Sequence, residues 1–274
     1  MLKGAIHIHS TYSDGEFTLA QLREVYMALG CDFVCMTDHA EYFDAAKIKS
    51  YIDECRSLSD ESFRFITGLE YTCDNRMHVL GYGVTSPVAT TNPQKVIRHI
   101  KNEGGISVIA HPMDSAFEWI ESFEELPDAI EVWNSKYDGR YAPRPETFRL
   151  LVRLQTRSPQ MRAFYGQDMH WKKQHRGLFN IVVCKTATGE KIAGEEIADE
   201  EILAAFARGN YYAVKENFEL PSSGMLSEDL LARFGSVNRR DARKRQLIKR
   251  AKKMIDRVGL TVPAPLKAQL RRIF

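Results

Sequence analysis

The sequence predicts an α/β fold in which about seven strand–helix units form a closed or nearly closed barrel, followed by a short basic helical extension. Segments with the hydrophobic period of strands alternate with segments of helical period through most of the 274 residues. Such alternation is typical of a parallel sheet covered by helices. The length is sufficient for one large core, and 44% apolar with 27% charged residues is ordinary for a globular protein.

The expected strands lie in the first 216 residues. The first of them, GAIHIH at 4–9, begins close to the N-terminus and carries two histidines. Each later strand is separated from the next by a turn or by a helical segment. The remaining expected strands are 32–39, 63–71, 77–83, 106–111, 129–134, 161–168, 178–186 and 210–216.

Helices are expected between many of these strands. Thr18 and Gln21 have the spacing of a capping box, so one helix is predicted to begin there. Gly30 suits its C-terminal end, because glycine readily adopts the left-handed conformation that ends helices. The other expected helices are 44–57, the segment from Asn92-Pro93 to Gly104-Gly105, and 199–208.

Composition changes near the end of the chain. PSSG at 221–224 resembles a linker, and residues 226–274 contain 14 Lys or Arg and 4 Asp or Glu, a net charge of +10. Because the whole chain carries +2, residues 1–225 carry −8. We therefore divide the chain into a large α/β domain, 1–220, and a basic extension, 221–274.

The extension is expected to be mostly helical. Leu247, Ala251 and Met254 recur at helical spacing, which predicts an amphipathic helix packed on the barrel or on another subunit. The alternative is a surface for nucleic acid or an anionic membrane. Nucleic acid is not favoured, because no aromatic residues are interleaved with the basic ones. The oligomeric state is left open.

The sequence gives no indication of export or of membrane insertion. No run of about 18 apolar residues occurs, and the first ten residues, MLKGAIHIHS, do not resemble a signal peptide. The five cysteines are odd in number and lack paired zinc-type spacing, so we interpret them as reduced core residues. A cytoplasmic protein without a transmembrane segment is expected.

The positions of the histidines are the strongest functional indication. Six of the eight lie at or just past the predicted carboxyl end of a strand, and in a parallel barrel those ends converge on one face. His7 and His9 are two residues apart on a strand and should project to the same side, and Asp168 and His170 repeat this spacing. The candidate ligands are His7, His9, Asp14, His39, Glu70, His78, His111, Asp168 and His170.

A metal site explains this cluster better than a structural role does. A single histidine at a strand end is usually a hydrogen-bonded structural residue, but clustered carboxylates repel one another unless a cation lies between them. Nitrogen and oxygen donors without thiolate favour Zn²⁺, Mn²⁺ or Fe²⁺. Nine donors exceed the needs of one ion, so two or three divalent ions are expected. No P-loop or GxGxxG motif suggests an organic cofactor.

The local motifs also occur in a recognisable order. They are HIHSTYSDG (7–15), TDHA (37–40), GLEYT (68–72), HVLGYG (78–83), AHP (110–112) and GQDMH (166–170). In order and spacing, over about residues 1–215, they resemble the motifs of the PHP (polymerase and histidinol phosphatase) superfamily. This resemblance implies a distorted (β/α)7 TIM-like barrel, a trinuclear metal centre and phosphoester hydrolysis.

The resemblance also assigns the ligands to individual ions. His7, His9, Glu70 and Asp168 would hold the first ion; Glu70, His78 and His111 the second; and Asp14, His39 and His170 the third. Many relatives have histidine where this chain has Asp14. A metal-bridging hydroxide would attack phosphorus, and the residues expected to take part in catalysis are Asp14, Glu70, Asp168 and His170.

The predicted substrate is a phosphomonoester, either a small phosphorylated metabolite or a nucleotide. Arg144, Lys172 and Arg176 are the candidates for contact with its phosphate, because Arg and Lys bind phosphate oxygens. Two alternatives remain: an exonuclease or phosphodiesterase acting on DNA or RNA ends, and a noncatalytic metal-stabilised binding module. An amidohydrolase is disfavoured, because no bridging lysine is evident after a middle strand.

Overall fold

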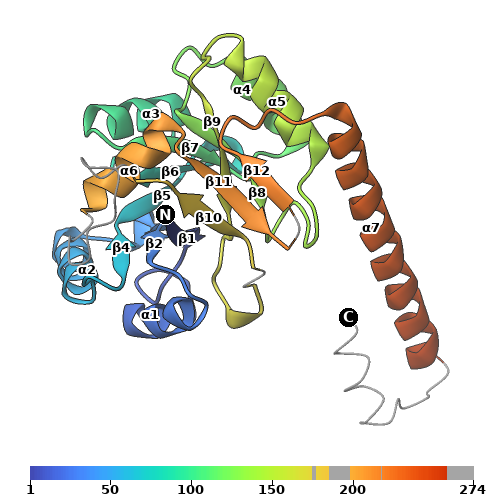
Figure 1. Ribbon diagram of the computed structural model, residues 1–274, viewed down its shortest axis with the longest axis horizontal. Helices are drawn as coiled ribbons and strands as arrows, with labels where there is room; N and C mark the ends of the chain where they lie inside the picture. Colours follow the sequence, from blue (N-terminus) through green and yellow to red (C-terminus); the bar gives the residue numbers. More distant parts are fainter. Residues whose placement is uncertain (175–176, 185–197, 217, 258–274) are drawn as a thin grey trace.

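Two mixed sheets of six strands form the centre of the protein (Figure 1). The computed structural model describes residues 1–174, 177–184, 198–216 and 218–257. In spatial order, the first sheet contains β12 (Phe218–Pro221), β11 (Tyr211–Lys215), β10 (Phe179–Val182), β1 (Leu2–Ile8), β2 (Phe33–Met36) and β4 (Arg64–Ile66). The second contains β3 (Asp38–His39), β5 (Gly68–Thr72), β6 (His78–Tyr82), β7 (Ile106–Ala110), β8 (Ala129–Asn134) and β9 (Arg162–Gly166).

The α/β class is confirmed, but the described residues do not form one closed parallel sheet. Parallel pairing is limited to β1–β2, β2–β4, β3–β5, β7–β8 and β8–β9, and the other neighbours are antiparallel. The reason is clearest between β5 and β6, which are joined by residues 73–77 alone. So short a connection allows only an antiparallel return, because a parallel neighbour needs a crossover of a dozen or more residues.

Two predicted strands are each divided between the two sheets. The expected strand 32–39 is interrupted at Thr37 into β2 and β3, and 63–71 is interrupted at Thr67 into β4 and β5. The sheets also meet where β1 runs beside the segment that follows β9. There His9 N donates to Met169 O (3.0 Å) and Gln167 N donates to Ile6 O (3.0 Å). One end of β1 is therefore held by both sheets.

Seven α-helices surround the sheets in the described part of the chain. The predicted capping box of Thr18 and Gln21 is present, and Asn92 accepts a hydrogen bond from Gln94 N (3.0 Å) at the start of another helix. Gly209, with φ of 76°, ends the helix predicted at 199–208. The helices are α1 (Leu19–Ala28), α2 (Ala45–Ser57), α3 (Pro93–Asn102), α4 (Phe117–Glu121), α5 (Pro145–Gln155), α6 (Asp199–Arg208) and α7 (Glu228–Arg257).

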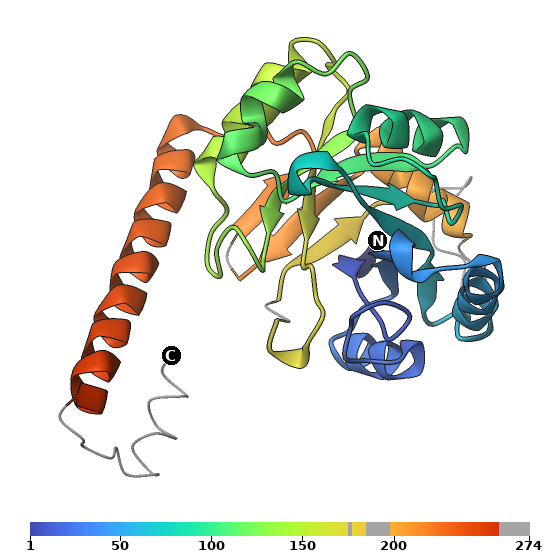
Figure 2. The same cartoon turned by 180° about the vertical axis from the view of Figure 1, so that it is seen from behind.

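The C-terminal helix α7 is attached to the body only by its first turns. Leu231 and Phe234 are buried, and the Phe234 ring lies 6.4 Å from that of Phe148 in α5. Beyond this contact the helix extends away from the sheets, as both views show (Figures 1 and 2). Leu247 and Met254 are 65% and 66% exposed, so the prediction that this apolar stripe packs on the barrel is wrong.

The strand before α7 overlaps the linker that the sequence analysis expected. β12 was not predicted, and it ends at the first residue of the expected linker. The domain boundary at residue 220 stays a prediction.

Among the described residues, no helix combines the length and the apolarity needed to cross a bilayer.

Candidate metal centre

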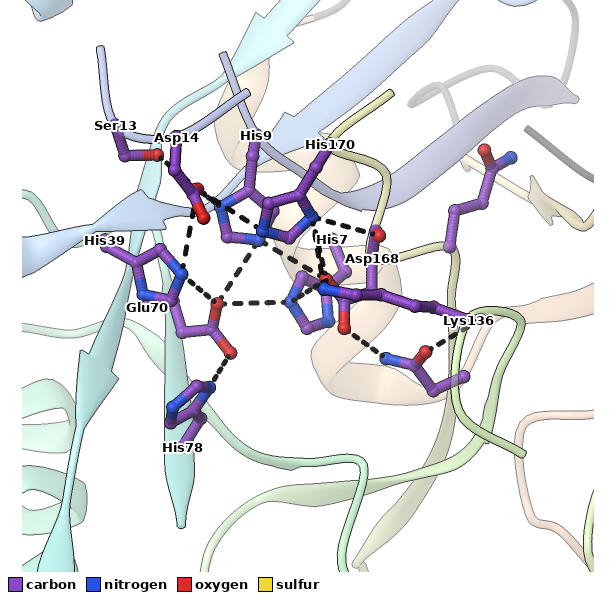
Figure 3. A network of polar contacts seen from close by, with 12 residues as sticks. His7, His9, Ser13, Asp14, His39, Glu70, His78, Lys136, Asp168 and His170 are labelled. Atoms are coloured by element: carbon purple, nitrogen blue, oxygen red, sulfur yellow. Dashed lines mark hydrogen bonds and ion pairs between the residues drawn. The ribbon is translucent and has the colours of Figure 1, made fainter. Parts of the chain in front are cut away.

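All nine predicted ligands lie together at one end of the two sheets, and Figure 3 labels all of them except His111. His7 is in β1, His9 follows it, and Asp14 is in the loop before α1. The prediction that His78 follows the carboxyl end of a strand is wrong, because it is the first residue of β6. Since β6 runs antiparallel to β5 and β7, its first residue nevertheless reaches the end where β7 stops before His111.

Glu70 lies at the centre of five imidazoles, and its carboxylate is almost completely buried. Its two oxygens divide the histidines into two groups. Oε2 lies 3.4 Å from His7 Nε2, 3.2 Å from His9 Nε2 and 3.6 Å from His39 Nε2, whereas Oε1 lies 2.7 Å from His78 Nδ1 and 3.4 Å from His111 Nε2. A carboxylate placed in this way can bridge two cations.

Asp168 and Asp14 complete the cluster on either side of His9. Asp168 Oδ1 lies 3.8 Å from the Nε2 atoms of both His7 and His9, and 3.2 Å from His170 Nδ1. Asp14 Oδ1 lies 3.3 Å from His170 Nε2 and 3.7 Å from His9 Nδ1. Three overlapping sets of donors are close enough to hold an ion: His9, Asp14, His39 and His170; His7, His9 and Asp168; and His7, Glu70 and His111.

Backbone strain is concentrated at three of the candidate ligands. His7, His111 and Asp168 have positive φ values of 62°, 30° and 51°, which non-glycine residues rarely adopt. His7 also lies at the register shift between β1 and β2, so it is the extra residue of a β-bulge. Its direction is therefore set by the bulge and not by the simple strand alternation that the sequence suggested. Such strain persists where the surroundings enforce it, and it is common at functional sites.

Glu131 in β8 holds two of the histidines in place. Its Oε1 lies 2.7 Å from His7 Nδ1, which leaves His7 Nε2 directed at the cluster. Its Oε2 accepts hydrogen bonds from the backbone N of His111 (2.9 Å) and from Asn134 Nδ2 (3.0 Å). A carboxylate on the far nitrogen of a histidine fixes its tautomer and orientation for metal binding.

Gly166, the last residue of β9, leaves room for this carboxylate. A Cβ at this position would overlap the Glu131 carboxylate and would lie 2.9 Å from His7 Cβ. We expect Gly166→Ala to displace both side chains and to weaken metal binding by about 10–100-fold, the usual effect of disturbing such a supporting contact. Competition against a chromophoric chelator measures this affinity. Gly235→Ala in α7 is the control, and equal affinities for the two variants would contradict the role given to Gly166.

The loop that carries Asp14 is held by a buried carboxylate. Asp38 accepts hydrogen bonds from Ser10 N (2.8 Å), Ser10 Oγ (2.8 Å), Ser13 N (3.1 Å) and Ser13 Oγ (2.6 Å). Burial raises the pKa of Asp38, although these hydrogen bonds act in the opposite direction. Asp38 thus positions the loop, and its contacts give it no direct part in the cluster.

The electrostatics of the cluster favour a positive charge at its centre. Burial opposes the charged form of His7, yet the Glu131, Asp168 and Glu70 carboxylates outweigh burial and raise its pKa well above the ordinary value. Burial likewise opposes ionisation of Glu70 and Asp168, but His7 is the main group that holds the pKa of both carboxyls well below the ordinary value. By contrast, burial lowers the pKa of His9 to about 4.

Unpartnered nitrogens show that the residues present fit metal ions. Within the described residues, four buried imidazole nitrogens have no hydrogen-bond partner: His7 Nε2, His9 Nδ1, His9 Nε2 and His39 Nδ1. A buried polar atom without a partner is unfavourable by about 1–3 kcal/mol. A neutral imidazole nitrogen beside buried carboxylates is a preferred donor for Zn²⁺ and similar ions, so bound metal would satisfy these atoms.

Two of the three predicted phosphate-binding residues, Arg144 and Lys172, form their hydrogen bonds outside the cluster. Arg144 is held by Asp138 Oδ1, Asp114 Oδ1 and Pro112 O, each at 2.6 Å. Lys172 is exposed, and its backbone N donates to Glu16 Oε2 (3.1 Å). Arg176 lies outside the described residues. Their role in substrate binding stays a prediction.

Lys136 is a neighbour of the cluster that the sequence analysis missed. Its Nζ lies 3.0 Å from Asp168 Oδ1 and 3.4 Å from His170 Nδ1 (Figure 3). Burial opposes its charge, but Asp168 raises the pKa of Lys136, so the side chain is a cation at the site. The other site residues were expected at or just past the ends of strands. Lys136 meets this criterion, because it follows β8 by two residues. Its presence removes the reason for which an amidohydrolase was disfavoured.

The chain is similar to known proteins in sequence and in fold. A part of the chain is 32% identical over 77 residues to the DNA polymerase/3'-5' exonuclease PolX of Bacillus subtilis (strain 168). That match covers 25% of this chain and 14% of the relative, so the chain spans about a seventh of the length of this curated protein.

Two solved structures show a similar fold. One is a two-domain protein from Bacteroides vulgatus ATCC 8482 that contains a predicted PHP-like metal-dependent phosphoesterase, with 17% identity, a TM-score of 0.53, and coverage of 86% of this chain and 69% of that chain. The other is PsfC from Pseudomonas syringae PB-5123, with 14% identity, a TM-score of 0.50, and coverage of 74% and 88%. The family model described as PHP domain matches residues 5–259, and the chain therefore belongs to the PHP domain family.

Proposed function

We propose that this protein is a metal-dependent phosphoesterase that hydrolyses a phosphomonoester of a small metabolite or nucleotide. The observation that carries the proposal is the Glu70 carboxylate, which lies between two groups of imidazoles. In the group formed by His7, His9 and His39, four buried nitrogens have no hydrogen-bond partner among the described residues. Such a site suits more than one divalent ion, and Zn²⁺, Mn²⁺ and Fe²⁺ match its donors. Membership of the PHP domain family supports the same reading.

Three sets of residues would hold the ions. His7, His9, Glu70 and Asp168 would bind one ion, and Glu70 would share a second with His78 and His111. Asp14, His39 and His170 would bind a third, supported by the distance of 3.3 Å between Asp14 Oδ1 and His170 Nε2. When bound, such ions activate a water molecule at neutral pH and neutralise the charge of a phosphoryl group.

Side chains of this chain would position the substrate beside the ions. Lys136 is a cation next to Asp168 and His170 and can donate hydrogen bonds to phosphate oxygens. Tyr137 and Trp171 are exposed, and their rings lie 4.7 Å from His111 and 5.5 Å from His170. These aromatic faces border the cluster and can pack against the organic part of a substrate.

A substrate panel tests the proposed function. The protein loaded with Mn²⁺, Zn²⁺ or Fe²⁺ is assayed with phosphorylated metabolites, an aryl monoester, an aryl diester, a labelled oligonucleotide and an amide. Preferential turnover of monoesters supports the proposal. Faster cleavage of the diester or oligonucleotide would support the exonuclease or phosphodiesterase alternative, which the PolX relative favours. Tight metal binding without any turnover would indicate a noncatalytic module.

Lys136→Met tests whether this cation binds the phosphate. Removing a hydrogen bond to a charged group is unfavourable by about 1.5–3 kcal/mol, which corresponds to a loss in kcat/KM of about 10–100-fold. Because Lys136 is not a predicted ligand, we expect the metal content to stay unchanged while inhibition by inorganic phosphate weakens.

Lys172→Met is the matched comparison for this prediction, since Lys172 is exposed and was the lysine expected from sequence. A larger loss in kcat/KM from Lys172→Met than from Lys136→Met would assign phosphate binding to Lys172 instead of Lys136. Both variants are measured for metal content by elemental analysis, so that a loss of metal is separated from a loss of phosphate binding.

A further inference from the structure

The distal part of α7 is the most strongly charged surface of the described chain that the metal centre leaves unexplained. Residues 239–257 contain ten Arg or Lys and two Asp, a net charge of +8. Asp241 and Arg245 form an ion pair (2.9 Å), and the net charge of +8 is what remains after both Asp residues are counted. Like charges one turn apart destabilise a helix, so neutralisation by a polyanion would stabilise it.

Four of these cations form a stripe along one face of the helix. Arg239, Arg243, Arg250 and Lys253 are spaced by four, seven and three residues, which places them on the same side. All four are exposed, and none forms an ion pair with another described residue. With a rise of 1.5 Å per residue, the stripe is about 21 Å long. We call these four residues the basic stripe.

The body of the protein holds the basic stripe away from its own surface. At the base of α7, Leu231 and Phe234 are buried, and Asn238 Nδ2 donates to Pro143 O (2.8 Å). From there the helix extends away from the sheets (Figures 1 and 2). The anchored base fixes the direction of the helix, and the stripe is left open to a partner.

We propose that the basic stripe binds the phosphate backbone of nucleic acid. Arg and Lys in a row contact phosphates without reading sequence, and such contacts supply most of nonspecific affinity. Described residues 235–257 contain no aromatic side chain, so base stacking has no platform there and duplex or structured nucleic acid is the expected ligand. The proposal concerns binding and does not depend on the hydrolytic activity.

A membrane surface and a second copy of the chain fit this helix less well. On the face beside the basic stripe, Leu247, Ala251 and Met254 form a short apolar row, but Arg240 and Lys244 continue the same row toward the base. A membrane-surface helix presents a broad apolar face with large residues along its length. Pairing with a second α7 would bring two charges of +8 together, which Coulomb repulsion disfavours.

Fluorescence anisotropy of a labelled 20-base-pair DNA or RNA duplex tests the proposal with the full chain. We expect micromolar affinity at low salt and a slope of log K against log salt of about −3.6, because each neutralised phosphate contributes about −0.9. The variant R239Q/R243Q/R250Q/K253Q should lose at least about tenfold in affinity and flatten the slope. Circular dichroism checks that its helix content is unchanged.

The matched control removes four exposed cations from α2 and α3, in the variant K49Q/R56Q/K95Q/R98Q. It lowers the net charge equally, and it should retain the affinity and the slope of the original protein. Equal losses in the two variants would overturn the proposal, because overall charge would then explain binding. Tighter binding to phosphatidylserine vesicles than to the duplex, or a dimer broken by L247K/M254K, would overturn it in favour of a membrane or a second copy.

Discussion

Replacing Asp168 with alanine is expected to reduce phosphomonoester hydrolysis by about 10³-fold or more while the protein stays folded. Asp168 Oδ1 lies within 3.8 Å of donor atoms of His7, His9 and His170, so its loss opens one of the donor sets. Metal ions supply several kcal/mol of transition-state stabilisation, and each 1.36 kcal/mol corresponds to a factor of ten in rate. The assay is turnover of the best substrate from the panel, with metal content measured in the same sample.

The Asp168 variant needs two controls. Its removal leaves Lys136 Nζ without its carboxylate partner and leaves Asn134 Nδ2 with Glu131 alone, so some loss of stability is expected. Asp168→Asn keeps the size of the side chain and should also be inactive, whereas Asp53→Ala, on the surface of α2, should retain full activity. An Asp168→Ala protein with the rate of the original protein would exclude the proposed mechanism.

Metal loading is expected to raise the melting temperature by on the order of 10 °C relative to protein treated with a chelator. A ligand present at 1,000 times its Kd stabilises the folded state by about 4 kcal/mol, and each kcal/mol shifts the melting temperature of a chain of this size by about 2–4 °C. The physical source is the buried cluster, where Glu70 and Asp168 lie among imidazole nitrogens that lack hydrogen-bond partners. Differential scanning fluorimetry with each ion measures the shift.

Glu70→Gln separates specific from nonspecific stabilisation. The substitution keeps the shape of the side chain but removes the charge that lies between the two groups of imidazoles. The variant should show a shift of no more than about a quarter of that in the original protein. If it kept the whole shift, or if no ion stabilised the original protein, the buried cluster would not be a metal site.

The gathering of the candidate ligands could be predicted from sequence because strand ends gather side chains on one side of a sheet. That rule placed His39, His111 and Asp168 at the ends of strands, where the structure has them. That rule alone does not give the direction of β6, but the short connection between the expected strands 63–71 and 77–83 already indicates an antiparallel return. Nor could the rule show the bulge at His7, because a bulge changes the pairing of strands without changing the hydrophobic pattern.

The remaining errors arise where tertiary contacts decide the outcome. Two apolar runs, 32–39 and 63–71, were predicted as single strands, and only their pairing shows that each contributes to two sheets. The apolar residues around Leu247 do recur at helical spacing. That spacing alone does not show whether other residues pack on the apolar stripe, and in the structure the base of α7 directs the stripe into solvent. Lys136 follows β8 by two residues and satisfies the positional rule, so the statement that no lysine is evident after a middle strand is wrong.

The junction between β1 and the segment after β9 makes the proposed metal centre depend on more than half of the chain. The hydrogen bonds of His9 N with Met169 O and of Gln167 N with Ile6 O join residues about 160 positions apart. Closing so long a loop is slow and entropically unfavourable, so these contacts should form late in folding. A chain emerging from the ribosome would therefore hold its first two histidines for most of its synthesis without a complete set of partners. Uptake of the ions would mark the moment at which folding is finished.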